Sequence, residues 1–366
     1  MGYEVDYIAV GEGEKSGDAI CLRYGNLAGP REEQVVITID GGTIESGDKV
    51  VEHVKAHYCT DSVDVAILSH PDTDHASGMR QILENLRVGM VAMHLPWDHS
   101  HAAKALLEDS SISTDSIRTK LRRNLSAARE IEQIAKRKQI PIVEPFAGAT
   151  NNSGLVVLGP TKDYYREMLC CFDCMPTTTN YAASNTLAQI LRQFGQSASK
   201  WISENWFTET LKEPEPDATS PENNSSVIFM LQIDGQKLLF TGDAGVPALH
   251  SAIDYANSVR ISVGGINFFD VPHHGSRRNL GPSIVNRLFG SIRTNDTKDW
   301  TAFISAAKAG EPKHPNKRVT NALRRRGASV SVTAGRSICF PFQAPPRAGW
   351  VSIEPIPFYT QVEDDE

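Results

Sequence analysis

The segment Val63-Asp64-Val65-Ala66-Ile67-Leu68 runs directly into Ser69-His70-Pro71-Asp72-Thr73-Asp74-His75, and this junction decides the fold. The first part is a short apolar run that is typical of a buried strand. The second part places four possible metal ligands within six residues: His70, Asp72, Asp74 and His75. A loop that follows a rigid strand can aim such side chains at one point. We therefore predict a metal site at the end of this strand.

The spacing of these four side chains favours two ions. In an extended segment His70, Asp72 and Asp74 would project to one side, because side chains repeat every two residues there. A bend between Asp74 and His75 would then turn one group toward each ion. Four ionisable groups so close together would repel one another or be forced to hold protons, unless bound cations compensate their charges. A surface turn rich in aspartate is the alternative, but two histidines inside the run favour metal binding.

Further polar motifs end predicted strands in the second half of the chain. Asp243 closes the run Leu238-Leu239-Phe240-Thr241-Gly242-Asp243, where a carboxylate can bridge two cations. His273-His274-Gly275-Ser276 follows the run Phe268-Phe269-Asp270-Val271-Pro272. Adjacent histidines point in different directions, so we expect one to bind metal and the other to orient substrate or a ligand.

The sequence leaves the choice between His273 and His274 open, and we assign His273 to the metal. We assign catalytic roles to Asp74, which is also a predicted ligand, and to His274 and His314. His314 lies in Lys313-His314-Pro315 and could protonate a leaving oxygen, as could the histidine of the 273–274 pair that does not bind metal.

Strands alternate with helices along the first hundred residues, which indicates a layered α/β fold. We predict strands at 7–10, 17–22, 35–39, 63–68 and 88–93, and helices at 49–57 and 78–86. Two later strands, 226–231 and 237–240, flank Asp234-Gly235, which predicts a hairpin. Mainly helical insertions are predicted at about 102–140 and 162–222. We assign residues 1–345 to one domain and 346–366 to a C-terminal extension with an acidic end.

Seven motifs occur in a fixed order: Gly17-Asp18-Ala19-Ile20, Ile39-Asp40-Gly41-Gly42, the His70–His75 run, Asn224-Ser225-Ser226-Val227, the run ending at Asp243, Val271-Pro272-His273-His274-Gly275-Ser276, and Lys313-His314-Pro315-Asn316. In this order they resemble the metallo-β-lactamase-fold superfamily and, more narrowly, its ComEC-type hydrolase domain and stand-alone relatives. The resemblance covers roughly residues 1–100 and 150–340. It implies an αββα sandwich with a dinuclear site at one edge of its sheets. We predict that residues 1–100 form one β-layer of this sandwich and residues 223–340 form the other. The implied ligands are His70, Asp72, Asp74, His75, Asp243 and one of His273 and His274.

The sequence departs from the superfamily at two positions. Asp72 stands where the commoner His-x-His-x-Asp-His run has its second histidine, as in the ComEC-like branch. Oxygen in place of nitrogen makes Mn²⁺ or Mg²⁺ more competitive against Zn²⁺. Gly159 stands where relatives often have a histidine before a proline. One ion would then lack a protein ligand, bind water in its place, or be bound by His94, His99 or His101.

The leading functional hypothesis is a hydrolase with two divalent ions, Zn²⁺ or Mn²⁺, that cleaves phosphodiesters through a metal-bound hydroxide. Nucleic acid is one candidate substrate, and Lys308, Lys313, Arg277 and Arg278 are candidates to hold phosphate. Basic residues of the first insertion, such as Lys120 and Arg123, form either a solvated face or a surface for polyanions. The alternatives are a hydrolase of esters, amides or lactams, and a degenerate metal-binding scaffold in a larger assembly.

Composition excludes several other classes of protein. The 366 residues are 40% hydrophobic and 22% charged, which is ordinary for a globular protein and ample for a core. No apolar run reaches the length of a membrane helix, and the N-terminus lacks the pattern of a signal peptide, so we expect a cytoplasmic protein without membrane contact. The net charge of −7 requires that any contact with a polyanion come from a local patch.

Overall fold

The structure is a computed structural model that describes residues 1–11, 16–107, 111–175, 200–308, 314–348, 350 and 353–364. One sheet has the strand order β14 (Ile338–Phe342), β1 (Gly2–Tyr7), β2 (Ile20–Gly25), β3 (Gln34–Ile39), β4 (Ser62–Ile67), β5 (Arg87–Ala92) and β6 (Ile142–Val143). The second has the order β13 (Ala328–Val332), β12 (Trp300–Ile304), β11 (Phe268–Asp270), β10 (Gln236–Phe240), β9 (Ile228–Ile233) and β7 (Leu155–Gly159).

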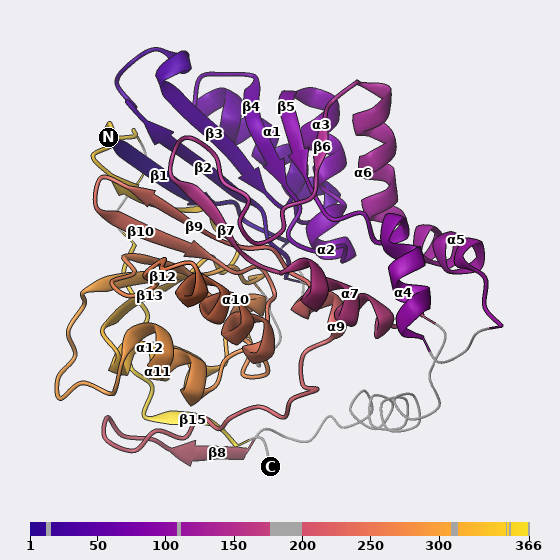
Figure 1. The fold of residues 1–366 in the computed structure, drawn as a ribbon. Helices are drawn as coiled ribbons and strands as arrows, with labels where there is room; N and C mark the ends of the chain where they lie inside the picture. The colour runs from indigo at the N-terminus through magenta and orange to yellow at the C-terminus, as the bar shows by residue number, and fades with distance from the viewer. Residues whose placement is uncertain are drawn as a thin grey trace.

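Helices cover the outer faces of the two sheets (Figure 1). On the first sheet lie α1 (Ile44–His57) and α3 (Met79–Asn85), and α6 (Ser126–Arg137) packs against α3. The helices α4 (Ser100–Leu106) and α5 (Thr114–Asn124) lie to the side of this sheet. On the second sheet lie α10 (Val246–Ser258), α11 (Pro282–Phe289) and α12 (Lys317–Arg325). The short helices α2 (Thr73–Ala76) and α9 (Pro221–Asn224), together with α7 (Lys162–Cys170), lie near the strand ends. None of the described helices is long and apolar enough to cross a membrane.

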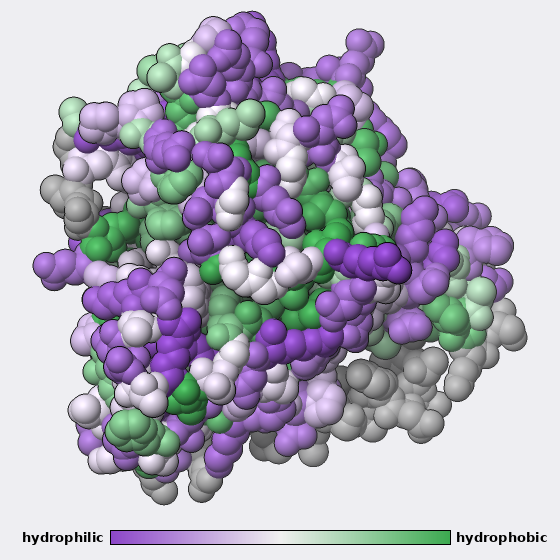
Figure 2. Space-filling model, turned by 60° about the vertical axis from the view of Figure 1, so that its left-hand side comes forward, coloured by the Kyte–Doolittle hydropathy of each residue, from purple (hydrophilic) through white to green (hydrophobic). Residues whose placement is uncertain are grey.

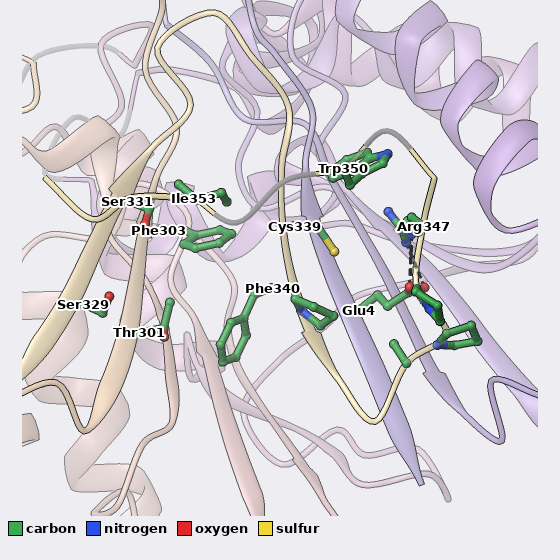
Figure 3. Close-up of a pocket in the computed structure, with 14 residues that line it drawn as sticks. Glu4, Thr301, Phe303, Ser329, Ser331, Cys339, Phe340, Arg347, Trp350 and Ile353 are labelled. Atoms are coloured by element: carbon green, nitrogen blue, oxygen red, sulfur yellow. Dashed lines mark hydrogen bonds and ion pairs between the residues drawn. The ribbon is translucent and has the colours of Figure 1, made fainter.

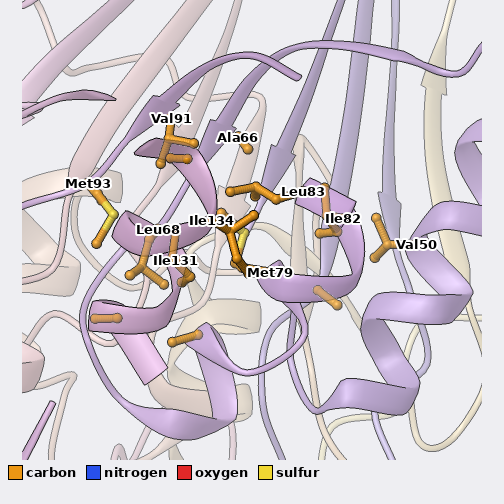
Figure 4. Close-up of a cluster of buried hydrophobic side chains, with 14 of the residues drawn as sticks. Val50, Ala66, Leu68, Met79, Ile82, Leu83, Val91, Met93, Ile131 and Ile134 are labelled. Carbon is orange, nitrogen blue, oxygen red and sulfur yellow. The ribbon is translucent and has the colours of Figure 1, made fainter. Parts of the chain in front are cut away.

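Three apolar layers hold this arrangement together. The outer layer of the first sheet is drawn in Figure 4, where Met79 and Leu83 of α3 lie beside Ile134 of α6 and Ala66 of β4. A second layer fills the space between the sheets, and a third lies under α10, α11 and α12. Burying one aliphatic side chain of this kind stabilises the fold by about 1.5–3 kcal/mol. The predicted αββα sandwich is confirmed.

Strand direction decides where functional loops can lie. β3, β4, β5 and β6 are parallel to one another, as are β10, β11, β12 and β13. β9 and β10 form the predicted hairpin, in which Asp234 and Gly235 both have positive φ, 49° and 76°. Two such residues match the twist of the flanking strands. The carboxyl ends of each parallel set therefore lie together at one edge.

The sheets differ in one respect from the sequence interpretation, which placed residues 1–100 in one layer and 223–340 in the other. β14 follows the second set of strands but pairs with β1, and β7 precedes that set but pairs with β9. Each of these strands completes the sheet that the other half of the chain begins. A local pattern cannot show such pairings, because partners more than 70 residues apart leave no trace in a short window.

The two predicted insertions have different structures. Residues 102–140 contain most of α4 and all of α5 and α6, as expected. In 162–222 the described residues form α7, β8 (Lys200–Ser203) and α9, whereas 176–199 lie outside the description. β8 pairs with β15 (Gln361–Asp364), so the acidic C-terminal extension is joined to the second insertion. Glu204 next to β8 pairs with the buried Arg325 of α12 at 2.7 Å.

The C-terminal segment also crosses back over the first sheet. Arg347 donates to Asp6 at 2.7 and 2.9 Å and to Glu4 at 3.1 Å, and both acceptors are buried. Figure 3 shows Arg347 and Glu4 together beside a cavity of about 420 Å³ between β14 and the β12–β13 edge. On the face in Figure 2, hydrophobic side chains gather near the middle, and hydrophilic side chains surround them.

Candidate metal centre

The predicted site residues follow strands whose carboxyl ends meet. Asp40 follows β3, and the His70–His75 run follows β4 in the first sheet. Asp243 follows β10, and the histidine pair 273–274 follows β11 in the second sheet. The backbone joins the two sheets here, since Val227 N donates to the Ser69 carbonyl at 2.9 Å. The site is therefore built at the edge of the sandwich, as the resemblance implies.

A first group of possible ligands contains His70, His75 and Asp243. One ligand atom of each lies within 4.8 Å of the others, and all three residues are buried. His75 Nε2 is 3.5 Å from Asp243 Oδ1, and His70 Nε2 is 3.9 Å from Asp243 Oδ2. In the described part of the chain, both Nε2 atoms and Asp243 Oδ1 have no hydrogen-bond partner. Unpaired buried polar atoms are costly, so three that face one another suit a shared cation.

A second group contains Asp74, His75 and His274, again with ligand atoms within 4.8 Å. His75 thus belongs to both groups, and its ring centre is 4.2 Å from that of His70 and 5.9 Å from that of His274. Asp72 extends the first group, because its Oδ2 lies 3.7 Å from His70 Nε2. Imidazole and carboxylate donors suit both zinc and manganese. The residues present therefore fit divalent cations.

The segment that carries Asp72, Asp74 and His75 is not extended, so that part of the prediction is wrong. Asp72 has an extended backbone, but Thr73–Ala76 form the single helical turn α2. The amide of Ala76 donates to the Asp72 carbonyl at 2.9 Å and closes this turn. Asp74 and His75 still point in different directions, because successive side chains of a helix are rotated by about 100°.

The structure places His274 in the ligand group, where the sequence interpretation had His273. His274 is buried, and its Nδ1 lies 2.9 Å from the Ser305 carbonyl oxygen and 3.5 Å from Asp18 Oδ1. His273 is 32% exposed, and its Nδ1 lies 2.5 Å from Asp243 Oδ2. Both histidines have positive φ, 48° and 56°, an uncommon conformation that turns their rings apart. The geometry favours exchanging the two roles.

His314 lies next to this pair, with its ring centre 6.1 Å from that of His273. Burial, together with the charges of His273, His274 and Arg278, lowers the pKa of His314 to about 3. The ring is therefore neutral at physiological pH. A neutral imidazole can donate one hydrogen bond, and the role of His314 as a proton donor stays a prediction. Its neighbour Lys313 lies outside the described residues.

Protons compensate the charges of the ligand groups when no cation is bound. Burial alone would lower the pKa of His75, but the carboxylates of Asp243 and Asp40 raise it well above its ordinary value. Burial would raise the pKa of Asp243, yet His273 and His75 hold it well below its usual range. Burial likewise opposes the effect of Asp18, which raises the pKa of His274 to about 9. A divalent cation would displace these protons.

Three buried carboxylates position the ligands, and the sequence interpretation gave them no role. Asp40 Oδ2 lies 2.8 Å from His75 Nδ1, and Asp18 is the carboxylate beside His274. Asp270 accepts hydrogen bonds from Thr241 N and Gly242 N at 3.0 and 3.2 Å, which shapes the turn before Asp243. Asp18 and Asp40 stand beside glycines in two of the seven motifs, and that position was the available signal.

The histidines considered as substitutes at Gly159 lie elsewhere. His94 packs between the rings of Phe146 and Tyr165, with centres 4.5 and 4.4 Å away. His99 Nε2 lies 2.8 Å from Glu144 Oε1, and His101 is exposed on α4. Among the described residues, none of these three histidines belongs to a group of possible metal ligands.

An open cavity of about 660 Å³ lies beside the ligand groups. Asp72 and His273 line its inner end, and α7, the 216–220 loop and the start of α9 form its walls. Arg278 and Asn279 of the loop after β11 also line it. Residues of the second predicted insertion, from α7 and the 216–220 loop, thus lie beside the predicted site.

No family model matches this chain. ComE operon protein 3 of Bacillus subtilis (strain 168) is 26% identical over 117 residues, which are 31% of this chain and 13% of that protein. The matched part is therefore a small fraction of that relative.

Two solved structures are similar to this chain at low sequence identity. The metallo-β-lactamase fold protein YhfI from Bacillus subtilis is 9% identical, with a TM-score of 0.43 over 93% of this chain and 100% of its own. A diphosphatase from the PhnP family is 8% identical, with a TM-score of 0.40 over 93% of this chain and 98% of its own. With its two-sheet sandwich, ordered motifs and ligand groups at one edge, this chain has a metallo-β-lactamase-like fold and resembles ComE operon protein 3 over the matched segment.

Proposed function

We propose that this protein is a metal-dependent hydrolase with two adjacent divalent ions and that it cleaves phosphodiesters. The observation that carries the proposal is the pair of overlapping ligand groups that share His75 and flank Asp243. We assign His70, Asp72 and Asp243 to one ion, and Asp74, His75, His274 and Asp243 to the other. Two divalent ions, when bound, activate water and stabilise charge on a phosphoryl group.

The residues of this chain hold that arrangement in place. Asp40, Ser69 and the Ser305 carbonyl each contact the Nδ1 atom of a ligand histidine, at 2.8 Å from His75, 2.9 Å from His70 and 2.9 Å from His274. Contacts of this kind fix the tautomer and leave each Nε2 atom for the cation. The ligand atoms thus need little rearrangement on binding, which favours tight coordination.

His273 is the residue that we assign to proton transfer. Its Nδ1 is engaged by Asp243, so Nε2 is the nitrogen left for substrate, and the residue lines the cavity. Asp243 would hold the ring in one orientation, as a carboxylate orients a catalytic histidine. His314, which is neutral, would position the leaving oxygen by a hydrogen bond.

The test is hydrolysis of bis-p-nitrophenyl phosphate by protein loaded in turn with Mn²⁺ and Zn²⁺. We expect turnover that Asp243→Ala and Asp74→Ala reduce by orders of magnitude, because both changes remove ligands. p-Nitrophenyl acetate and a chromogenic lactam serve as parallel substrates. Turnover of either one, without phosphodiester turnover, would assign the site to acyl compounds. Metal binding without turnover of any substrate would favour the scaffold alternative.

A further inference from the structure

The cavity beside the ligand groups has the size of a site for a small molecule. At about 660 Å³ it falls within the range of 300–1,000 Å³ that is usual for such sites. Asp72 and His273 connect it to the ligand groups, so a substrate in the cavity would meet the metal centre directly.

The charges around the cavity oppose a polymeric anion. Among the described residues that line it, Arg278 is the one lysine or arginine, whereas Asp173 and Asp217 are acidic, as is Asp72, which we assign to the metal. Proteins that bind nucleic acid neutralise many phosphates along a groove. The single guanidinium of Arg278 instead suits the binding of one phosphate group.

Arg278 is tied to both sides of the cavity. Its amide donates to Ser276 Oγ at 3.2 Å, and its carbonyl accepts from Thr219 Oγ1, on the facing loop, at 2.9 Å. The next residue, Asn279, donates from Nδ2 to the carbonyl of Asp243 at 2.8 Å. The backbone position of Arg278 is therefore fixed relative to the metal ligands.

Part of the cavity lining is apolar. Tyr164 and Met168 of α7 face the cavity together with three prolines: Pro216, Pro221 and Pro247. An aromatic ring beside aliphatic groups is a suitable surface for the planar or apolar part of an ester.

We propose that the substrate is a small organic phosphodiester, with its single phosphate group held by Arg278 and its organic group against α7. This inference rests on the proposed function and narrows it. Water adds across one P–O ester bond: the water oxygen becomes bonded to phosphorus, the ester oxygen leaves, and that oxygen takes up a proton. Arg278 then determines specificity, because it recognises one phosphate where a nucleic acid would present many.

The test compares thymidine 5′-(p-nitrophenyl) phosphate with single- and double-stranded DNA as substrates of the Mn²⁺-loaded full chain. We expect kcat/KM for the small diester to fall about 10- to 100-fold in Arg278→Met, mainly through KM, because charge-assisted hydrogen bonds to phosphate are lost. Arg278→Lys should recover part of that loss. The control is Arg87→Met, which removes an exposed arginine at the amino end of β5, and it should match the wild type.

The outcomes separate this inference from the function on which it rests. Turnover of bis-p-nitrophenyl phosphate, with no effect of Arg278→Met, would overturn the inference alone. So would faster cleavage of DNA than of the small diester, above all if Lys120→Ala/Arg123→Ala on α5 reduces it. Failure of the wild type on every phosphodiester would overturn both. Urea unfolding midpoints equal to that of the wild type would show that the Arg278 variants are folded.

Discussion

At the scale of single residues, the chemistry depends on which nitrogen of each histidine is left free. His75 and His274 each have a carboxylate near Nδ1, Asp40 and Asp18 respectively, while Ser69 contacts His70. The ligand types were evident from the sequence, because four of them lie within six residues. Their partners come from other strands, and residues as far apart as Asp18 and His274 have no visible relation in the chain.

The role of Asp40 can be tested directly. Asp40→Asn keeps the shape of the side chain but removes the charge that orients His75 and stabilises its bond to a cation. We expect the affinity for Zn²⁺ or Mn²⁺, measured by competition with a chelator, to fall about 10- to 100-fold. Asp48→Asn on the exposed part of α1 is the matched control. Equal affinity in Asp40→Asn and wild type would show that Asp40 does not position the ligand.

Metal binding should depend on pH in a defined direction. The pKa of His75 is raised well above its ordinary value and that of His274 to about 9, so both rings hold protons near neutral pH when no cation is bound. A cation must displace them, so affinity should rise with pH up to about 9, by about tenfold per unit for each proton released. Calorimetry in buffers of different ionisation enthalpy measures this release. Binding at pH 7 without proton release would contradict the account.

At the scale of elements, the sequence predicted what local pattern controls. Apolar runs predicted β3, β4, β5, β9 and β10, and the Asp-Gly turn predicted the hairpin that joins β9 to β10. The helical turn α2 was missed because Pro71 and the alternating aspartates indicate an extended segment. β7 and β14 could not be assigned to their sheets, since both depend on distant partners.

The position of α2 and α3 depends on a close approach of backbones at Gly78. A Cβ atom there would lie 1.9 Å from the Gly41 carbonyl oxygen and 2.4 Å from that of Thr43. We expect Gly78→Ala to lower the free energy of unfolding by about 1–3 kcal/mol, the range for overpacked sites. Gly264→Ala, whose Cβ would meet just one atom, Ser262 Oγ at 3.9 Å, should change it by less than about 0.5 kcal/mol. Equal urea midpoints would contradict this packing argument.

At the scale of the whole molecule, the C-terminal segment contacts both sheets. Arg347 lies between the rings of Tyr58 and Trp350 and pairs with the buried Asp6 of β1, and further along the segment Ile356 N donates to the Val330 carbonyl of β13 at 2.9 Å. The sequence indicated an extension but not its contacts, because a lone arginine in a proline-rich stretch has no local partner. Its acceptors lie more than 300 residues earlier in the chain.

Removing Arg347 should destabilise the protein. Burial would raise the pKa of Asp6, but His53 and Arg347 hold it well below its usual range, so Asp6 is charged in the folded state. Arg347→Met would leave that buried charge with His53 and the Tyr58 hydroxyl as its remaining partners, so we expect a cost at the lower end of the range for a broken buried pair, about 3 kcal/mol at pH 7. The difference from wild type should shrink below about pH 4, where protonation removes the charge. Arg87→Met is the exposed control, and an equally small effect of Arg347→Met on urea unfolding would exclude the link.

The proposed chemistry depends on two adjacent divalent ions that share Asp243. The most direct measurement is the metal content of protein reconstituted with Zn²⁺ or Mn²⁺ and freed of excess metal, determined by elemental mass spectrometry. We expect about two ions per wild-type chain and a clear reduction in Asp243→Ala, because that change removes the shared ligand. A wild-type chain that holds no ion, or an Asp243→Ala variant that holds two ions as tightly as wild type, would contradict the account.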